Sequence, residues 1–223
     1  MIAIAIDGPA GAGKSTIARL TAKKLGYLYV DTGALYRTVG YAAKLRGIDP
    51  ADEPQVAAML PEIAVDLSFD KDGVQQTLLN GQDVSGQIRS PEMSRYASQV
   101  SAHKAVREYL LWLQRKLAQE HNVIMDGRDI GTTVLPHADL KIYLTATPED
   151  RARRRFDEYL SKGVSVDYDK LLNDIKQRDY DDSHREISPL RRAEDAKLVD
   201  TSGNTLEESL ELMEAMIRRH LGI

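Results

Sequence analysis

Short apolar runs alternate along the chain with segments whose apolar residues recur at helical spacing. The runs predict five core strands, at residues 2–6, 28–30, 123–125, 140–144 and 197–200. Between them, spacing such as that of Val106, Leu110, Leu113 and Leu117 places apolar side chains on one face of a helix. Strands that alternate with helices in this way build βαβ units, so the pattern predicts an α/β fold with a parallel sheet.

The middle of the chain has a different hydrophobic period. Apolar residues at odd positions from Ile63 to Phe69 alternate with more polar or smaller ones, and this period of two is typical of a strand. Residues 74–79 and 82–84 predict two further strands, and the dipeptides Asp72-Gly73 and Asn80-Gly81 predict the turns between the three. We therefore expect a small antiparallel β insertion within the α/β fold.

Capping residues mark the starts of three late helices. The first of these helices is predicted to start after Thr147, which is followed by proline and two acids, and the second after Asp167. Residues 205–208 have the pattern of a capping box, which predicts the start of the third. Gly163 interrupts the first of these helices. Trp112 lies beside the apolar stripe of an earlier helix, and we predict that it contributes packing and not function.

Composition and charge exclude several classes of protein. The chain has 223 residues, 42% of them hydrophobic, which suits one α/β domain with an insertion better than two domains. No apolar run approaches the roughly 18 residues of a membrane span. Because a strand begins at residue 2, there is no room for a signal peptide, and we expect a cytoplasmic protein that does not bind membranes.

Metal and macromolecular partners are constrained in the same way. The chain has no cysteine, and its five histidines show no ligand spacing, so the expected metal is a nucleotide's own Mg²⁺. The net charge of −4 gives no general attraction to nucleic acid. No exposed apolar stripe is evident, and we expect a monomer.

The most specific chemical motif lies at residues 8–15. It reads G-P-A-G-A-G-K-S, a complete G-x-x-x-x-G-K-[ST] phosphate loop between a predicted strand and a predicted helix. Backbone N–H groups and the positive end of the helix hold phosphate in such a loop. Lys14 would reach the β- and γ-phosphates, and Ser15 would help to hold Mg²⁺. The alternative is a glycine-rich turn without a ligand.

The surrounding residues favour phosphoryl transfer over hydrolysis. Asp126 ends a predicted strand but is followed by Gly127, not by an acid that could position water, and the sequence lacks an Asn-Lys-x-Asp segment that would read guanine. Arginine side chains are forked and permanently charged, which suits the neutralisation of a moving phosphoryl group. They occur at Arg37, at Arg107 and Arg128, and late in the chain at residues 151 and 153–155, at Arg178 and at Arg185.

The late arginines have two interpretations. Arg178, Asp182 and Arg185 share one helical face by their spacing, and this face is either a surface salt-bridge ladder or a site for a ribose and a phosphate. The arginine-bearing segment bounded by Gly163 could close as a lid that excludes water.

Six segments of the chain match a known family. They are residues 6–16 (I-D-G-P-A-G-A-G-K-S-T), 31–37 (D-T-G-A-L-Y-R), 84–90 (V-S-G-Q-I-R-S), 97–102 (A-S-Q-V-S-A), 126–132 (D-G-R-D-I-G-T) and 178–185 (R-D-Y-D-D-S-H-R). Over nearly its whole length the chain resembles the bacterial cytidylate kinases, which are nucleoside monophosphate kinases. The resemblance implies a phosphate-loop NTPase fold with a five-stranded parallel sheet flanked by helices. It also implies transfer of the ATP γ-phosphate to CMP or dCMP with Mg²⁺, giving CDP or dCDP, in pyrimidine nucleotide metabolism.

The resemblance also divides the chain and assigns roles to its residues. Residues 1–60 and 99–223 would form the kinase core, residues 61–98 a monophosphate-binding insertion, and residues 150–166 the lid. The nucleotide-binding loop would comprise Gly8, Pro9, Ala10, Gly11, Ala12, Gly13, Lys14, Ser15 and Thr16. The acceptor would be bound by Thr32 and Arg37 on its phosphate side, by Ser98, Arg107 and Asp129 at the cytosine edge, by Arg128 and Arg185 at the phosphate, and by Arg178 and Asp182 at the sugar. The family often has serine at the position of Thr32, and because the hydroxyl is kept we expect its contact to be kept too.

The expected base selectivity and catalysis have a clear chemical basis. A carboxylate and an arginine complement the amino donor and the two acceptors of cytosine, whereas uracil would set a carbonyl against Asp129. The transition state would be neutralised by Lys14, Arg128, Arg151, Arg155 and Arg185, and Mg²⁺ would contact Ser15 and, through water, Asp126. The expected partners are ATP and CMP or dCMP.

Three other functions remain compatible with parts of the pattern. A kinase of another small acceptor, such as UMP, AMP or a metabolite, would share the fold. The late arginines also suit a nucleotide-dependent nucleic-acid binder, although the negative net charge and the lack of an aromatic-rich basic patch argue against it. The complete Lys14-Ser15 pair argues against a binding module without activity.

Overall fold

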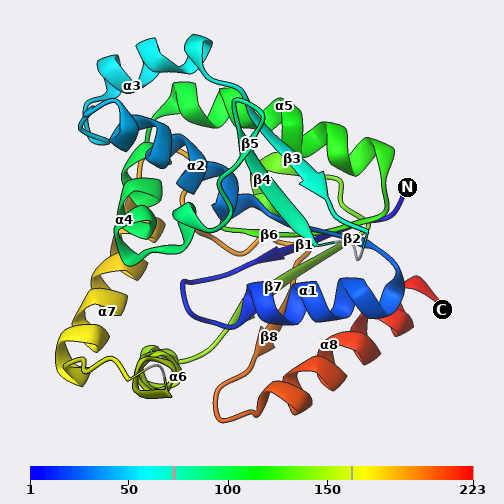
Figure 1. Ribbon diagram of the computed structural model, residues 1–223. Helices are drawn as coiled ribbons and strands as arrows, with labels where there is room; N and C mark the ends of the chain where they lie inside the picture. Colours follow the sequence, from blue (N-terminus) through cyan, green and yellow to red (C-terminus); the bar gives the residue numbers. More distant parts are fainter. Residues whose placement is uncertain (72–73, 162, 223) are drawn as a thin grey trace.

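A five-stranded parallel sheet forms the centre of the molecule and confirms the predicted α/β fold (Figure 1). The computed structural model describes residues 1–71, 74–161 and 163–222. The strand order is β2-β6-β1-β7-β8, and each neighbouring pair is parallel. The strands are β1 (Ala3–Asp7), β2 (Leu28–Asp31), β6 (Val123–Gly127), β7 (Leu140–Thr145) and β8 (Lys197–Asp200). All five occur where the apolar runs predict them.

Helices cover both faces of this sheet. Figure 1 shows α1 and α8 on one face, and α2, α4 and α5 on the other. In the central strand β1, Ile4 and Ile6 pack into the cluster that includes α1 and α8, whereas Ala5 belongs to the opposite cluster. This two-sided burial explains why the strand is a continuous apolar run. The helices are α1 (Lys14–Leu25), α2 (Thr32–Leu45), α3 (Glu53–Met59), α4 (Pro91–Val100), α5 (Lys104–Glu120), α6 (Pro148–Ser161), α7 (Tyr168–His184) and α8 (Leu206–Leu221).

The predicted helix caps are confirmed by hydrogen bonds. The Thr147 hydroxyl accepts from the backbone N–H of Asp150 at the start of α6 (3.1 Å). Asp167 caps α7 in the same way, and Thr205 with Glu208 forms the predicted capping box of α8. These short polar side chains satisfy N–H groups that the first helical turn leaves without a partner.

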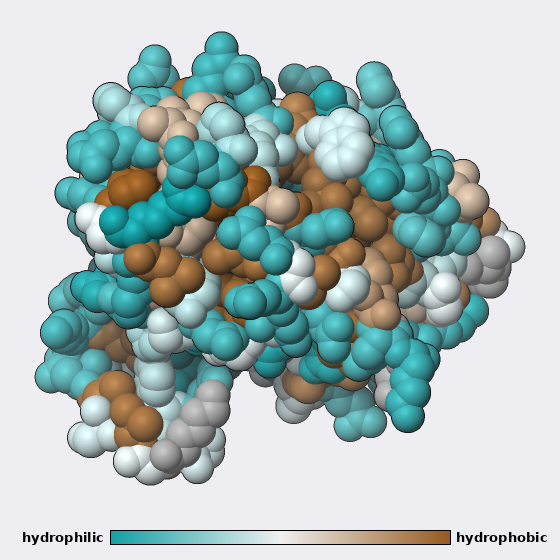
Figure 2. All heavy atoms as spheres, turned by 45° about the horizontal axis from the view of Figure 1, so that its top comes forward, coloured by the Kyte–Doolittle hydropathy of each residue, from teal (hydrophilic) through white to brown (hydrophobic). Residues whose placement is uncertain are grey.

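The surface is largely hydrophilic in the view of Figure 2, with hydrophobic side chains gathered in patches between the polar ones. Among the residues that the structure describes, no helix is long and apolar enough to cross a membrane. Trp112 is 67% exposed, so the prediction that it packs is wrong. It comes two residues after the buried Leu110 and therefore lies on the other side of α5.

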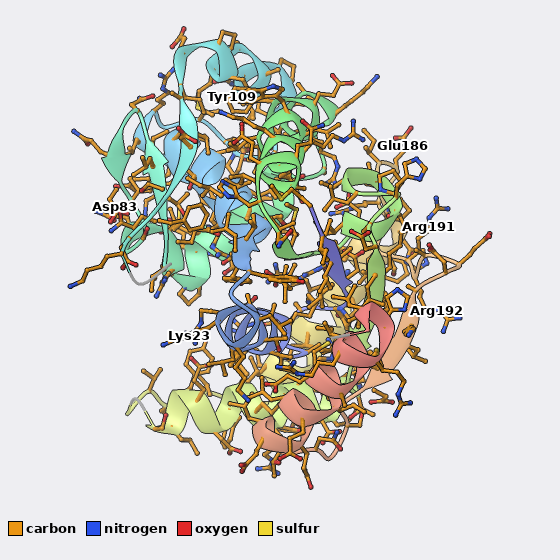
Figure 3. All side chains as sticks on the ribbon, turned by 90° about the vertical axis from the view of Figure 1, so that its right-hand side faces the viewer. Lys23, Asp83, Tyr109, Glu186, Arg191 and Arg192 are labelled. Atoms are coloured by element: carbon orange, nitrogen blue, oxygen red, sulfur yellow. The ribbon has the colours of Figure 1, made fainter. Side chains whose placement is uncertain are left out.

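The predicted antiparallel insertion is a three-stranded sheet of β3 (Val65–Phe69), β4 (Gln75–Leu79) and β5 (Gln82–Asp83). Asn80 and Gly81, both with positive φ (51° and 79°), form the tight turn between β4 and β5. The predicted turn at Asp72-Gly73 lies outside the described residues. Tyr109 of α5 (Figure 3) ties this sheet to the helical layer, because its hydroxyl donates to the carbonyl of Ile63 (2.8 Å). The sequence boundaries 61–98 of the insertion stay a prediction.

Candidate active site

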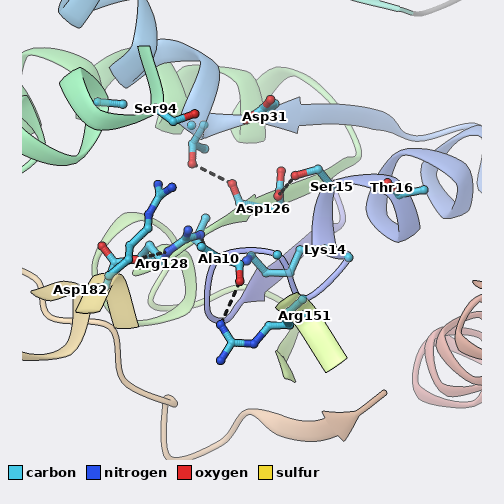
Figure 4. A pocket seen from close by; sticks show the side chains of 18 of the residues that line it. Ala10, Lys14, Ser15, Thr16, Asp31, Ser94, Asp126, Arg128, Arg151 and Asp182 are labelled. Carbon is cyan, nitrogen blue, oxygen red and sulfur yellow. Dashed lines mark hydrogen bonds and ion pairs between the residues drawn. The ribbon is translucent and has the colours of Figure 1, made fainter. Parts of the chain in front are cut away.

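A cleft of about 750 Å³ lies at the carboxyl ends of the parallel strands, which is where open α/β sheets bind ligands (Figure 4). Ala10 to Thr16 of the phosphate loop line it, together with Asp126, Arg151 and Arg155. All the predicted acceptor-binding residues also line it: Thr32, Arg37, Ser98, Arg107, Arg128, Asp129, Arg178, Asp182 and Arg185. Gly8 and Pro9 do not line the cleft. The structure therefore brings nearly the whole predicted set into one site.

The phosphate loop depends on a glycine at its start. Gly8 has a φ of 148°, and a Cβ atom at this position would lie only 1.9 Å from the carbonyl oxygen of Leu144. No other residue fits this close approach to β7. Pro9 contributes its carbonyl oxygen, to which the Lys14 ammonium donates (2.7 Å).

Lys14 is a buried cation at the base of the cleft. Lys14 is only 5% exposed. Burial, with the nearby positive charge of Arg128, holds the pKa of Lys14 well below its usual range. A negatively charged ligand would stabilise the charged form of Lys14 and so raise its pKa again. The site therefore favours an anion near the Lys14 amine.

Asp126 and Ser15, the predicted metal pair, are in direct contact. The Ser15 hydroxyl donates to Asp126 Oδ2 (2.8 Å), and the Tyr29 hydroxyl donates to Asp126 Oδ1 (2.9 Å). A hydroxyl and a carboxylate are oxygen ligands of the kind that Mg²⁺ takes beside phosphate oxygens and water, so this pair fits the ion. The hydroxyl of Thr32 instead donates to the backbone carbonyl of Asp126 (2.7 Å) and fixes the end of β6 against the start of α2.

Burial and the negative charge of Asp31 raise the pKa of Asp126 to about 6. Between pH 4 and 6 the folded protein therefore holds a proton that the unfolded chain has released, so this group lowers stability as the pH rises through that range. We expect the variant Asp126→Asn to gain stability relative to the wild type by on the order of 1 kcal/mol between pH 5 and pH 7.5. Urea unfolding at both pH values measures this, and a pH-independent difference would contradict it.

The acceptor side of the cleft centres on a buried ion pair. Arg107 and Asp129, 8% and 4% exposed, contact each other through Nη2 and Oδ2. Arg107 also donates to the carbonyl of Ser101 (2.9 Å), and its guanidinium lies 5.5 Å from the ring centre of Tyr36. Arg185 Nη2 lies 3.9 Å from Asp129 Oδ1. A buried carboxylate and a guanidinium thus face the cleft side by side.

Arg178 and Arg128 also line the cleft. Arg128 Nε donates to Asp182 Oδ2 (2.8 Å), so part of the predicted helical face is an ion pair within the protein. Burial and the charge of Arg128 lower the pKa of Arg178 to about 10, and its Nε atom is buried without a hydrogen-bond partner. Positive charge exceeds negative charge here, as expected of a site for phosphate. Arg37, which also lines the cleft, is paired with Asp31 (2.7 Å).

Arg151 is held by the protein in this structure and does not project freely from a lid. It is 2% exposed and donates to the carbonyls of Ala10 and Ala146 (both 2.9 Å). Its two terminal nitrogens bind both carboxylate oxygens of Asp179 (2.9 and 2.5 Å). Arg151 therefore links the phosphate loop to α7, and its catalytic role stays a prediction.

Several residues of the site were missed by the sequence analysis. Tyr36 and Arg154 line the cleft, as do Asn204 and Thr205 before α8. Tyr36 lies within a family segment and Arg154 within the late arginine run, so both had a sequence signal. Asn204 and Thr205 had none for ligand binding, because only the packing of α8 beside α1 brings them to the loop.

Comparisons with known proteins agree with this geometry. The family described as "Cytidylate kinase" matches residues 4–219. A cytidylate kinase of Caldicellulosiruptor bescii is 52% identical over 210 residues, covering 94% of this chain and 92% of the relative. A cytidylate kinase of Bacillus subtilis is 47% identical, covering 93% of this chain and 92% of the relative. The solved structure of an uncharacterized protein from Eubacterium ventriosum has the same fold, with a TM-score of 0.54 at 12% identity, covering 97% of this chain and 98% of that one. The chain belongs to the cytidylate kinase family.

Proposed function

We propose that the protein transfers the γ-phosphate of ATP to CMP or dCMP, giving ADP and CDP or dCDP. The observation that carries this proposal is the buried Arg107–Asp129 pair, which opens into the same cleft as the phosphate loop. The loop supplies a donor site, and the pair supplies a polar edge that can read a base. The relatives named as cytidylate kinases support the same acceptor.

Cytosine fits this edge by its hydrogen-bonding groups. The Asp129 carboxylate would accept from the N4 amino group, while Arg107 would donate to the N3 and O2 acceptors. Ser98 is the third base contact of the proposal. Uracil carries an oxygen where cytosine has the amino group. This oxygen would face the Asp129 carboxylate, and two buried hydrogen-bond acceptors would then lie together without a donor.

The remaining contacts in the proposal hold the acceptor phosphate and the sugar. All six residues line the cleft: Thr32, Arg37, Arg128, Arg178, Asp182 and Arg185. The arginines would bind phosphate oxygens in forked pairs, and Asp182 with Arg178 would bind the sugar hydroxyls.

The reaction in this site needs no covalent intermediate. An oxygen of the acceptor monophosphate attacks the γ-phosphorus, the bond to the β–γ bridging oxygen breaks, and ADP leaves with its electron pair. Lys14, Arg128, Arg155 and Arg185 would stabilise the charge of the transferred group. Mg²⁺, held beside Ser15 and Asp126 on the donor phosphates, would neutralise further charge. Closure of residues 150–166 would exclude water.

A panel of acceptors tests the proposal. We expect the purified protein with ATP and Mg²⁺ to phosphorylate CMP and dCMP with the highest kcat/KM, ahead of UMP, AMP and GMP, as measured by ADP release. A better rate with UMP, AMP or GMP would refute the assigned acceptor. ATP turnover that needs no acceptor and rises with added RNA or DNA would instead favour the nucleic-acid alternative. A cytoplasmic location and a monomeric state stay predictions.

A further inference from the structure

Asp7 is a buried carboxylate to which the reaction above gives no task. It is the last residue of β1 and is 5% exposed. Its two oxygens accept from the backbone N–H groups of Ile130 and Gly131, both at 2.7 Å. These two residues begin the single helical turn Ile130–Val134, whose first N–H groups have no partner within the turn. Asp7 therefore caps this turn from a strand more than a hundred residues away in the sequence.

The residue placed to cap this turn locally is Asp129. Aspartate is among the preferred residues at the position before a helical turn, because its carboxylate can accept from the exposed N–H groups. Asp129 occupies that position and makes no side-chain cap hydrogen bond. Its carboxylate is directed instead to Arg107 and Arg185 on the acceptor side of the cleft.

Holding Asp7 in this place has an energetic cost. Burial raises the pKa of Asp7 to about 6, although both backbone hydrogen bonds act to lower it, and the negative charge of Asp129 raises it further. The hydrogen bonds to Asp7 thus do not fully offset the cost of burying its charge. A carboxylate kept in such a place points to a function beyond packing.

We propose that Asp7 is a positioning residue for base selectivity: it caps the turn at Ile130–Val134 and so leaves the Asp129 carboxylate free to face the acceptor base. Without the Asp7 carboxylate, the free N–H groups and the acceptor base compete for Asp129. The inference rests on the proposed function, because it assumes that Asp129 reads the base.

The variant Asp7→Asn tests the proposal. Its side-chain amide keeps the shape of the carboxylate but can accept from only one of the two N–H groups, and it sets a donor against the other. We expect the ratio of kcat/KM for CMP to that for UMP to fall about ten-fold, with a higher KM for CMP and a KM for ATP within about two-fold of the wild type. Steady-state kinetics with both acceptors measures this.

A matched control lies at the other end of the same strand. Asp139 Oδ2 accepts from the backbone N–H of Ala3 (2.8 Å), away from the cleft. Asp139→Asn makes the same chemical change and removes a carboxylate contact to β1, but we expect it to leave the CMP to UMP ratio unchanged. A purely structural role of Asp7 would lower stability without changing that ratio.

A double-mutant cycle separates positioning of Asp129 from other effects. In an Asp129→Asn background, Asp7→Asn should produce no further fall in the ratio, because the group that it positions is gone. An unchanged ratio in the single variant, or an equal fall in both backgrounds, would overturn the proposal. A wild type without CMP preference would refute the proposed function itself, which is a different result.

A second variant covers the case in which Asp7→Asn does not fold. Gly131→Ala keeps Asp7 but adds a Cβ atom 3.3 Å from its Oδ2 and 3.1 Å from the Lys141 side chain. We expect a smaller fall of the ratio in the same direction. A ratio equal to that of the wild type in a folded Gly131→Ala protein would count against the inference.

Discussion

Replacement of Lys14 by methionine is expected to lower kcat by about 10³-fold while the protein stays folded. Methionine keeps the length of the side chain but removes the charge that the phosphate loop presents to the transferred group, and loss of one such stabilising group has an effect of this size. Because the ligand-free fold holds the pKa of Lys14 well below its usual range, the charge destabilises that fold. We therefore expect the variant to have a higher unfolding temperature without nucleotide.

The two measurements for Lys14 are kcat with ATP, Mg²⁺ and CMP, and thermal unfolding without ligand. Lys23→Met is the matched control, since Lys23 is an exposed lysine near the end of the same helix (Figure 3). Its kcat should equal that of the wild type. A Lys14→Met enzyme within ten-fold of the wild-type kcat would show that this cation does not stabilise the transition state.

The variant Asp129→Asn is expected to lower the ratio of kcat/KM for CMP to that for UMP by about 10²-fold. The carboxylate can only accept, which matches the N4 amino group of cytosine. An amide can also donate, and it would do so to the O4 atom of uracil. The amide oxygen still accepts from Arg107, so the variant avoids leaving a buried arginine without any partner, as alanine would.

Acceptor kinetics with CMP, dCMP and UMP check the Asp129 prediction. Asp181→Asn serves as control, because Asp181 is an exposed carboxylate on α7 that accepts a hydrogen bond from the side chain of Gln177 (2.8 Å). An Asp129→Asn enzyme that loses rate equally with CMP and UMP would show that Asp129 supports the fold or the phosphate and does not read the base.

Much of the fold could be predicted from local pattern. The strand and helix periods, the Gly26 end of α1 and the caps of α6, α7 and α8 depend on residues within a few positions of one another, so the sequence displays them directly. The short helix α3 was not predicted, although Asp52 caps it and proline lies in its first turn. Seven residues carry too little periodicity for such a prediction. The prediction that Trp112 packs was wrong for a different reason. Each position along a helix turns the side chain by about 100°, so a residue next to the apolar stripe in the sequence can face solvent.

The candidate site divides in the same way. The phosphate loop is a contiguous motif, and the acceptor residues followed from the family resemblance, all of them within its matching segments except Arg107. The hydrogen-bond and ion-pair partners of these side chains followed neither from the motif nor from the family resemblance. Arg151 was expected to neutralise the transition state, which stays a prediction, and its bonds to Ala10, Ala146 and Asp179 were not foreseen. Thr32 was expected to contact the acceptor, and its hydroxyl is bonded to the backbone of Asp126.

Sequence patterns were enough to predict the parallel α/β architecture, the antiparallel insertion, the phosphate loop and the family to which the chain belongs. Three features became visible only with the packed fold: Asp7 caps the turn beside Asp129, Ser15 contacts Asp126, and Lys14 and the Nε atom of Arg178 are buried. The reason is physical: periods and caps arise from interactions within one or two helical turns. Hydrogen bonds such as that from Ile130 to Asp7, 123 positions apart, exist only once the sheet and its helices have packed. Burial, and with it every shifted pKa in the cleft, is a property of that packing.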